Sequence, residues 1–526
     1  MSRRVGIDLA LRGAHKAVVL DGTRAVGRPF TVSMDRTGMV RLLERAMAGV
    51  SEVSEFVLEP TGNAWLIPSA WLIGRGQRVV IAQGKKTSDL RKFYRKHVKS
   101  DVVDAETMGR LPELDPRGCH RLAMPSAAVL SLRRLVKQRE RFVRQATASK
   151  QRVLAVLELA HPHLLAALGG DKFTSAARAF LGRYLDPFRV KRLGQNRLGA
   201  FLARHNRGRR DPELAERVWE ACVRTWELYG ELRDACRLPC DYEQLQDEVN
   251  RELQALAFAE DTVAGLEEKI QELYIQVDPA QSLRQLPGIG PTIAPSIEAL
   301  VAGVGRFRNA RAFVSYCGLC PRHNQTGLSR REGMPMTKAG QRLLKKHLYL
   351  AAEVARRRDP VFAAKYAAFE ARGKHHSQIV IALAHMLARR VYAVLKRRDA
   401  GRLDSVPYEL RATDGQPINV ADATRLIAER YPSKRERQRR EQETKAASKS
   451  SPGPDSEGGS AAPAYSGQSE DSTIQAYDTL PLRAILDELR RRTDGRTTAS
   501  DLACGKTGDD VRITRTGDDQ NRLDKT

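Results

Sequence analysis

The sequence contains little cysteine. Seven cysteines are scattered over 526 residues, at Cys119, Cys222, Cys236, Cys240, Cys317, Cys320 and Cys504. An odd number at irregular spacing argues against a disulfide framework and favours a reducing compartment such as the cytoplasm. Cys317, Cys320 and His323 have the spacing of half a zinc site, but no second pair of ligands lies nearby, so zinc is not favoured.

Long apolar runs and acidic residues are also scarce. No apolar run approaches the roughly 20 residues of a membrane-spanning helix, and Met1–Arg4 lead directly into an expected strand, so no secretory signal is expected. The 89 Lys and Arg residues outnumber the 63 Asp and Glu, which gives a net charge of +26. This excess favours a nucleic-acid partner over a membrane surface. No internal repeat is visible, and the length predicts two or three domains.

The most informative stretch runs from Lys99 to Leu111. It has no Gly or Pro before Gly109, which predicts a helix that begins after Ser100, a favoured N-cap residue. Asp101 and Asp104 are three residues apart and therefore leave the same helix face. Two such carboxylates stay ionised together only if water, cations or a metal lies between them. The alternative is a solvated acidic first turn, which also suits the helix dipole.

Two earlier apolar runs end in a carboxylate. Val5–Ala10 contains Asp8, and Phe56–Gly62 contains Glu59. Each run predicts a buried strand with an acid at its tip. Four carboxylates, two on strand ends and two on a helix, are the ligands that a two-magnesium phosphoryl-transfer site needs, because hard cations prefer oxygen ligands.

The sequence around these acids resembles a known family. Gly-Ile-Asp at Asp8, Glu-Pro-Thr-Gly at Glu59 and Lys-Ser-Asp-x-x-Asp-Ala at Asp101 and Asp104 resemble the DEDD signature of insertion-sequence transposases. The group is the "IS one-ten" family of bridge-RNA-guided recombinases. The resemblance implies an α/β ribonuclease H-like first domain of the junction-resolvase type, with magnesium bound by the four acids. It also implies double-stranded DNA and a structured guide RNA as partners, and a homo-oligomer.

The expected elements of the first domain agree with that fold. They are strands at 4–10, 15–21, 28–34, 56–59 and 78–82, and helices at 37–50, 64–73 and from about 100. Between them, the stretch Lys85–Lys99 is dense in cations. It is either a solvated face or a grip on a phosphate backbone, and Lys99 beside the acids is a candidate nucleic-acid contact.

Two long helices are expected next, at about 126–158 and Tyr242–Val277. The second has apolar residues at steps of three, four or seven, which predicts an antiparallel coiled-coil arm, with an ordinary helical bundle as the alternative. The resemblance implies that this arm mediates dimerisation. The residues between the helices, from His161 to about Cys240, are interpreted as an elaboration of the arm that touches RNA or DNA.

Leu286-Pro287-Gly288-Ile289-Gly290 resembles the hairpin of a helix-hairpin-helix motif. Gly288 and Gly290 would let backbone N–H groups approach a phosphate at the start of a helix. Such a contact is independent of base sequence and positions the duplex. The alternative is a plain glycine turn between two helices.

A second block resembles the same transposase family. It comprises Gly318-Leu319-x-Pro321-Arg322, Thr326-Gly327 and Thr337-Lys338-x-Gly340. In the family, the serine before the glycine is the nucleophile that attacks DNA, whereas this chain has Thr326 at the matching position. A threonine hydroxyl supports the same chemistry, although its methyl group crowds the approach. Ser329 is the substitute candidate, and Arg322 and Lys338 are candidate nucleic-acid contacts.

These features divide the chain into four parts. The expected domains are 1–120 (ribonuclease H-like), 121–280 (arm with insertion), 281–400 (helical transposase domain) and 401–526 (partly disordered tail). Further helices are expected at Arg342–Arg358 and His375–Arg397. After about Pro432, Ser, Gly, Pro and Glu predict a disordered linker, followed by a short amphipathic helix at Pro481–Arg492.

Three functions remain in view. The first is a transposase or recombinase of the bacterial cytoplasm, associated with the nucleoid, which cuts and joins DNA through a covalent ester between a protein hydroxyl and DNA and is guided by an RNA. The second is a metal-dependent junction resolvase or nuclease that uses water as its nucleophile. The third is a non-catalytic nucleic-acid-binding protein, that is, a decayed copy.

Overall fold

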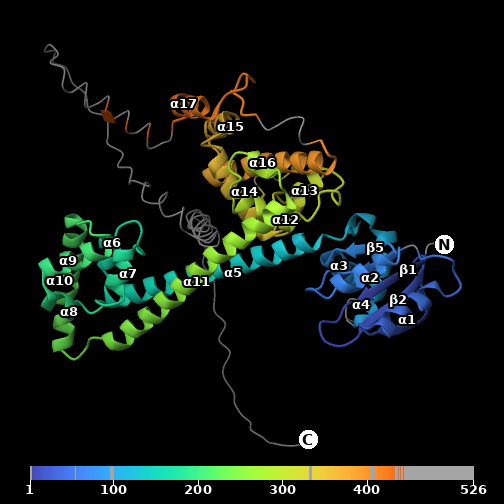
Figure 1. The fold of residues 1–526 in the computed structure, drawn as a ribbon, viewed down its shortest axis with the longest axis horizontal. Helices are drawn as coiled ribbons and strands as arrows, with labels where there is room; N and C mark the ends of the chain where they lie inside the picture. Colours follow the sequence, from blue (N-terminus) through green and yellow to red (C-terminus); the bar gives the residue numbers. More distant parts are fainter. Residues whose placement is uncertain are drawn as a thin grey trace, which may run out of the picture. The chain divides into compact units, whose positions relative to one another are not determined.

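The structure is a computed structural model that describes residues 3–53, 55–94, 100–327, 329–330, 334–402 and 409–432. Positions 436, 439, 442 and 443 are also described, and they are helical at the start of the predicted linker. Lys99, the rest of that linker and the helix expected at Pro481–Arg492 lie outside the described residues. The contacts divide the chain into two compact units (Figure 1). One contains residues 1–143 and 260–458, and the other contains residues 144–259.

The first unit begins with a six-stranded mixed sheet in the order β3-β2-β1-β4-β5-β6. β1 is antiparallel to β2 and parallel to β4, β4 is parallel to β5, and β5 is antiparallel to β6. The expected order of strands and helices is confirmed, except that the cationic stretch contains a helix, α3, which was not expected. The three-residue β6 at the sheet edge was not expected, since it is too short to show a pattern. The strands are β1 (Arg3–Asp8), β2 (His15–Asp21), β3 (Arg24–Val32), β4 (Glu55–Leu58), β5 (Val79–Ala82) and β6 (Cys119–Arg121).

Helices cover both faces of this sheet. Alternate residues of β4 point to opposite faces, so Phe56 and Leu58 join one core and Val57 joins the other. The first core contains Met39 of α1 and Leu72 of α2, and the second contains Met108 of α4. Central strands buried on both faces explain the unbroken apolar runs in the sequence. The helices are α1 (Arg36–Met47), α2 (Leu66–Gly74), α3 (Gly84–Tyr94) and α4 (Asp101–Leu114).

The two predicted long helices are confirmed as α5 (Ala127–Ala160) and α11 (Tyr242–Val277). Arg152 pairs with Glu252 at 2.6 Å and Arg139 pairs with Glu267, so residue numbers rise along one helix as they fall along the other. The two helices are therefore antiparallel. The use of this pair for dimerisation stays a prediction.

The second unit contains the C-terminal half of α5, the N-terminal half of α11 and the helices inserted between them. Buried Thr225 of α10 contacts the His161 ring at 3.1 Å, and Gln246 of α11 donates to the Leu181 carbonyl at 2.8 Å. These contacts join the inserted helices to both long helices. The inserted helices are α6 (Leu164–Ala167), α7 (Ser175–Leu181), α8 (Pro187–Leu193), α9 (Gln195–His205) and α10 (Pro212–Asp234).

The remainder of the first unit is helical. The expected helices at 342–358 and 375–397 are confirmed as α14 and α16, with ends shifted by a few residues. By length and composition, α16 is the one described helix that could cross a membrane, but half of its most apolar window is buried, as in a core helix. The elements are η2 (Ser282–Gln285), α12 (Ile293–Val301), α13 (Ala310–Tyr316), β7 (Gln325–Thr326), β8 (Ser329–Arg330), α14 (Arg342–Ala355), α15 (Pro360–Glu370), α16 (His376–Asp399) and α17 (Val420–Arg430).

Candidate functional site

Two of the four predicted acids lie at one edge of the sheet. β1 and β4 are parallel neighbours, with Ile7 paired to Leu58 at the end of the ladder. Asp8 and Glu59 are the next residues on each strand. Because parallel strands end at the same edge, the fold places these two carboxylates side by side there.

The other two acids reach this edge through close packing of α4 on β1. A Cβ added to Gly6 would lie 1.9 Å from the Ala105 carbonyl oxygen, so only glycine permits this approach. Ser100 caps the helix and accepts from the Val103 N–H at 3.3 Å, as predicted. The first turn of α4, with Asp101 and Asp104, is thereby held near the end of β1.

Burial and the electrostatic interactions among the four carboxylates raise the pKa of two of them. The pKa of Asp8 is raised from 3.8 to about 6, first by burial and then by the charges of Asp101, Asp104 and Glu59. The pKa of Glu59 is also raised, by burial and by Asp104. Like charges this close oppose one another's ionisation, which leaves the site in need of positive charge.

Helix α3 supplies part of that charge. The Arg91 Nε lies 2.9 Å from Oδ1 of Asp104. The other described cations of the Lys85–Lys99 stretch are partly paired too, since Lys86 bridges to Asp115 at 2.9 Å and Lys85 to Asp89 at 3.2 Å. Several cations of this stretch are therefore already paired with carboxylates of the chain, so the stretch agrees fully with neither alternative. The Arg91–Asp104 pair could not be predicted from the sequence, because it depends on how α3 and α4 pack.

Gly84, at the start of α3, supports Glu59. A Cβ at this position would lie 2.3 Å from Oε1 of Glu59, so a larger residue would displace the carboxylate. Sequence analysis missed Gly84, since a glycine before a basic helix resembles an ordinary turn.

The donor set is suited to a divalent cation. All four groups are carboxylates, and hard cations such as Mg²⁺ take oxygen ligands. Within the described residues, no three His, Cys, Asp or Glu side chains are grouped closely enough to hold one ion together. For these side chains to close around a cation, they would have to change rotamer, and Asp104 would have to leave its pair with Arg91.

The raised pKa of Asp8 makes a prediction about stability. Its folded pKa of about 6 exceeds the unfolded value of 3.8, so between these pH values the folded state holds a proton that the unfolded chain has lost. The free energy of unfolding therefore falls as pH rises from about 4 to 6. Asp8→Asn removes this penalty and should raise the free energy of unfolding by about 1–2 kcal/mol at pH 7.5 in chelator, after discounting for partial exposure.

Denaturant titration at several pH values measures this effect. The gain of the Asn variant should vanish near pH 3.5, where Asp8 is protonated in both states. Added Mg²⁺ should stabilise the native chain more than the variant. An Asn variant that is no more stable at pH 7.5 would contradict the crowding of the acids.

In the second predicted block, two backbone hydrogen bonds join the segment before a hairpin to the segment after it, and we call this pair of bonds the clamp. The Arg322 N–H donates to the Pro335 carbonyl at 2.9 Å, and the Thr337 N–H donates to the Cys320 carbonyl at 3.0 Å. Gly340, with a φ of +88°, lies so close to Gly318 that a Cβ would be 2.6 Å from the Gly318 nitrogen. The glycines of the two signature segments thus let two loops meet.

The hairpin presents the candidate nucleophiles. Thr326 of β7 pairs with Ser329 of β8, and Gly327 has a φ of +56° in the turn between them. Thr326 is exposed, which suits a hydroxyl that must meet a large substrate. Arg322 and Lys338 flank the clamp, are exposed, and make no ion pair with another described residue.

Cys317 has a structural role. It is fully buried in the helical core, and burial raises the pKa of its thiol. It therefore packs as a small apolar side chain. His323 is exposed, and the described residues contain no metal-binding group that includes it.

The Pro287–Gly290 hairpin lies between η2 and α12. Gly288 has a φ of +84°, and a Cβ there would be 2.0 Å from the Ala351 carbonyl oxygen, so its need for glycine comes from packing on α14. Gly290 faces open space. Nucleic-acid contact at either glycine stays a prediction.

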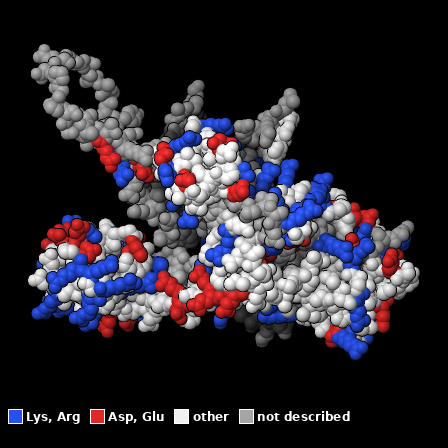
Figure 2. Space-filling view, turned by 45° about the horizontal axis from the view of Figure 1, so that its top comes forward, with Lys and Arg blue, Asp and Glu red and all other residues white. Residues whose placement is uncertain are grey.

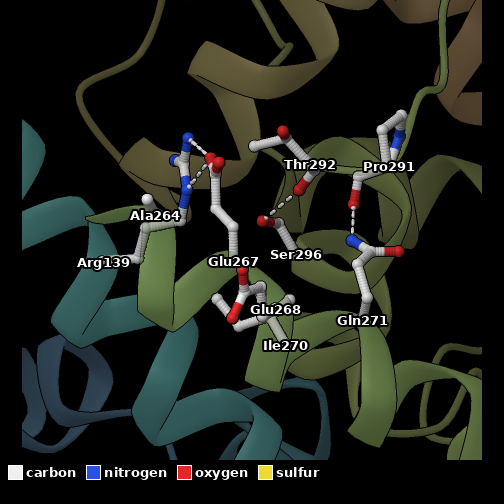
Figure 3. Close-up of a pocket in the computed structure, with 9 residues that line it drawn as sticks. All are labelled: Arg139, Ala264, Glu267, Glu268, Ile270, Gln271, Pro291, Thr292 and Ser296. Atoms are coloured by element: carbon white, nitrogen blue, oxygen red, sulfur yellow. Dashed lines mark hydrogen bonds and ion pairs between the residues drawn. The ribbon is translucent and has the colours of Figure 1, made fainter. Parts of the chain in front are cut away.

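A pocket of about 410 Å³ adjoins this hairpin (Figure 3). The Gln271 amide donates to the Pro291 carbonyl at 2.6 Å, which ties the hairpin to α11. Glu267, Glu268 and Arg139 line the pocket, and Arg139 pairs with Glu267.

Two family models match this chain. One, described as a transposase of the DEDD IS110 type, matches residues 5–162 and spans the four acids. The other, described as the transposase IS116/IS110/IS902 family, matches residues 280–367 and spans the hairpin and its clamp. Each candidate site thus falls within a separate family segment.

Curated relatives agree with the family models. A 44.8 kDa protein of insertion element IS116 from Streptomyces clavuligerus is 26% identical over 74% of this chain and 94% of its own length. A 43.6 kDa protein of IS110 from Streptomyces coelicolor is 24% identical over 65% of this chain and 79% of its own length. The pilin gene-inverting protein of Moraxella lacunata is 31% identical over 26% of this chain and 44% of its own length. From these matches and the arrangement of its acids, the chain belongs to the IS110 family of transposases and is an enzyme that acts on DNA.

Proposed function

We propose that the chain cuts and joins DNA at the ends of its insertion sequence through a covalent ester between Thr326 and DNA. The observation that carries this proposal is the crowding of Asp8, Glu59, Asp101 and Asp104 at one edge of the sheet. The order of strands and the position of the acids are consistent with a ribonuclease H-like domain.

The four acids are assigned to divalent-ion binding. Asp8 and Glu59 supply oxygens from the strand ends, and Asp101 and Asp104 supply them from α4. Mg²⁺ bound here would stabilise the negative charge that develops on the phosphate oxygens during phosphoryl transfer. Arg91 holds Asp104 until that carboxylate is recruited, and Gly84 leaves the space in which Glu59 moves.

Thr326 is assigned as the nucleophile. Its Oγ would attack the scissile phosphorus, a new Oγ–P bond would form, and the P–O bond to the departing sugar would break. The threonine proton would pass to solvent and the departing sugar oxygen would take up a proton. Exposure at a hairpin tip supports this role, because a hydroxyl within a packed core could not reach a phosphodiester.

We also propose that an RNA encoded by the element guides the choice of target. If base pairing with RNA selects the target, the protein needs contacts with nucleic-acid backbones more than contacts with base edges. A net charge of +26 supports such backbone contacts. Dimerisation through α5 and α11 would bring acids and hydroxyls of two copies into one assembly.

A second candidate function is a metal-dependent resolvase that uses water. One observation favours it: the four acids are assembled by the sheet and α4 alone, without the hairpin segment. It leaves the clamped hairpin around Thr326 without a role, and for that reason it ranks second.

A covalent-adduct assay separates the two functions. The full chain would be incubated with Mg²⁺, transcribed RNA from the element and a labelled plasmid that carries the element with its flanks. We expect labelled protein that withstands boiling in detergent and disappears with chelator. Cleaved DNA without labelled protein would instead support the resolvase.

A further inference from the structure

The inserted helices of the second unit carry an unusual concentration of positive charge. Residues 172–210 contain eleven Lys and Arg but only one acid, Asp186. Figure 2 shows Lys and Arg atoms in a broad stripe across the part that holds α6–α10, at the left of the view. Nine of these cations are exposed, and we call them the basic face: Arg183, Arg189, Lys191, Arg192, Arg197, Arg204, Arg207, Arg209 and Arg210.

The basic face is not neutralised by the chain. Among the described residues, none of its nine cations lies within ion-pair distance of a carboxylate. The neighbouring α10 differs, because its Arg217 pairs with Glu213 and its Arg224 with Glu220, each at 3.6 Å. Cations that lie close together repel one another and destabilise the fold unless an anion neutralises them. Their concentration on this surface therefore favours an anionic partner.

The scaffold under the basic face is well defined. Leu198 and Leu202 of α9 are buried, so packing of these side chains fixes which face of α9 is exposed. Arg197 and Arg204 are seven residues apart and therefore lie on one helix face, two turns or roughly 10 Å apart. Lys191 of α8 lies over the rings of Trp226 and Trp219, at 4.7 and 5.5 Å, and Arg183 lies over the Tyr184 ring at 5.6 Å. Arg197 and Arg204 make no such contact among the described residues, so they are the cations chosen for the test.

We propose that the basic face binds the sugar–phosphate backbone of double-stranded DNA. The family models match residues 5–162 and 280–367, so this surface lies outside both matched segments. Exposed, unpaired guanidinium groups favour phosphate oxygens, which they contact without reading the base sequence. DNA is the favoured polyanion because the chain is an enzyme that acts on DNA. The surface would bind DNA through a unit that contains neither the four acids nor the hairpin.

The test is the salt dependence of binding to a random-sequence 40-base-pair DNA duplex, measured with the full chain. The test variant is Arg197→Gln plus Arg204→Gln. Each lost phosphate contact should lower the slope of log affinity against log salt by about 0.9, so the slope should fall by about 2. Affinity at 0.1 M salt should fall by at least tenfold.

The matched control is Arg217→Gln plus Arg224→Gln, which removes the same charge from the same unit at arginines already paired with carboxylates. It should leave the slope within about 0.5 of the native value. Equal slopes for the native chain and the test variant, or equal losses in test and control, would overturn the proposal. A loss for an RNA duplex of the same length but not for DNA would overturn the choice of DNA. The test and control variants both leave Asp8, Glu59, Asp101 and Asp104 unchanged, so the result is independent of the metal-site proposal.

Discussion

Changing Asp101 and Asp104 together to Asn should lower the rate of DNA strand cleavage by at least about 10³-fold, which corresponds to about 4 kcal/mol of transition-state stabilisation. The two carboxylates leave one face of the first turn of α4 and both act on Asp8 across the site. The double change removes two of the four proposed carboxylate ligands and their negative charges, while the helix cap at Ser100 remains. Cleavage of a labelled plasmid that carries the element measures the effect.

The matched control is Glu106→Gln. Glu106 lies on the same helix, but it pairs with Arg110 at 2.6 Å and is not among the charges that raise the pKa of Asp8. This variant should cleave within about threefold of the native rate. A double Asn variant that kept more than a tenth of the native rate would exclude Asp101 and Asp104 as essential ligands.

Thr326→Ala should abolish the covalent protein–DNA adduct, a loss of at least about 100-fold, since no other group at that position carries a nucleophilic oxygen. Thr326→Ser should restore it, because serine keeps the hydroxyl and removes the methyl that crowds its approach. Detergent-resistant transfer of label from DNA to protein provides the measurement.

Ser329→Ala discriminates between the paired candidates. Ser329 lies opposite Thr326 in the hairpin, and only one hydroxyl should be required. Retention of the adduct in Ser329→Ala together with its loss in Thr326→Ala assigns the nucleophile. The reverse pattern would move the role to Ser329, and an adduct that survives both changes would exclude the hairpin.

Much of the first domain could be predicted from local pattern. Apolar runs that end in Asp8 and Glu59 predict strands with acids at their tips, and both are confirmed by the sheet. Ser100 followed by Asp101 and Asp104 predicts a capped acidic helix, which is α4. These features depend on spacing along the chain, and spacing is fully visible in a sequence.

Features that depend on packing could not be predicted in the same way. The Arg91–Asp104 pair and the contact of Gly84 with Glu59 exist only because α3 lies beside α4 and the end of β4. The packing of Gly288 against Ala351 was not visible in the sequence for the same reason, and its contact with a phosphate stays a prediction. The pattern of exposed and paired arginines in the second unit likewise requires coordinates.

The central claim is that Asp8, Glu59, Asp101 and Asp104 together hold divalent ions. A crystal of the full native chain grown with Mn²⁺ tests it most directly, through anomalous scattering at the manganese edge. The account predicts an anomalous peak bounded by oxygens of these four carboxylates, with Arg91 displaced from Asp104. The claim would be contradicted if the four acids were well ordered and no manganese peak lay among them. A manganese peak found only elsewhere in the chain would contradict it too.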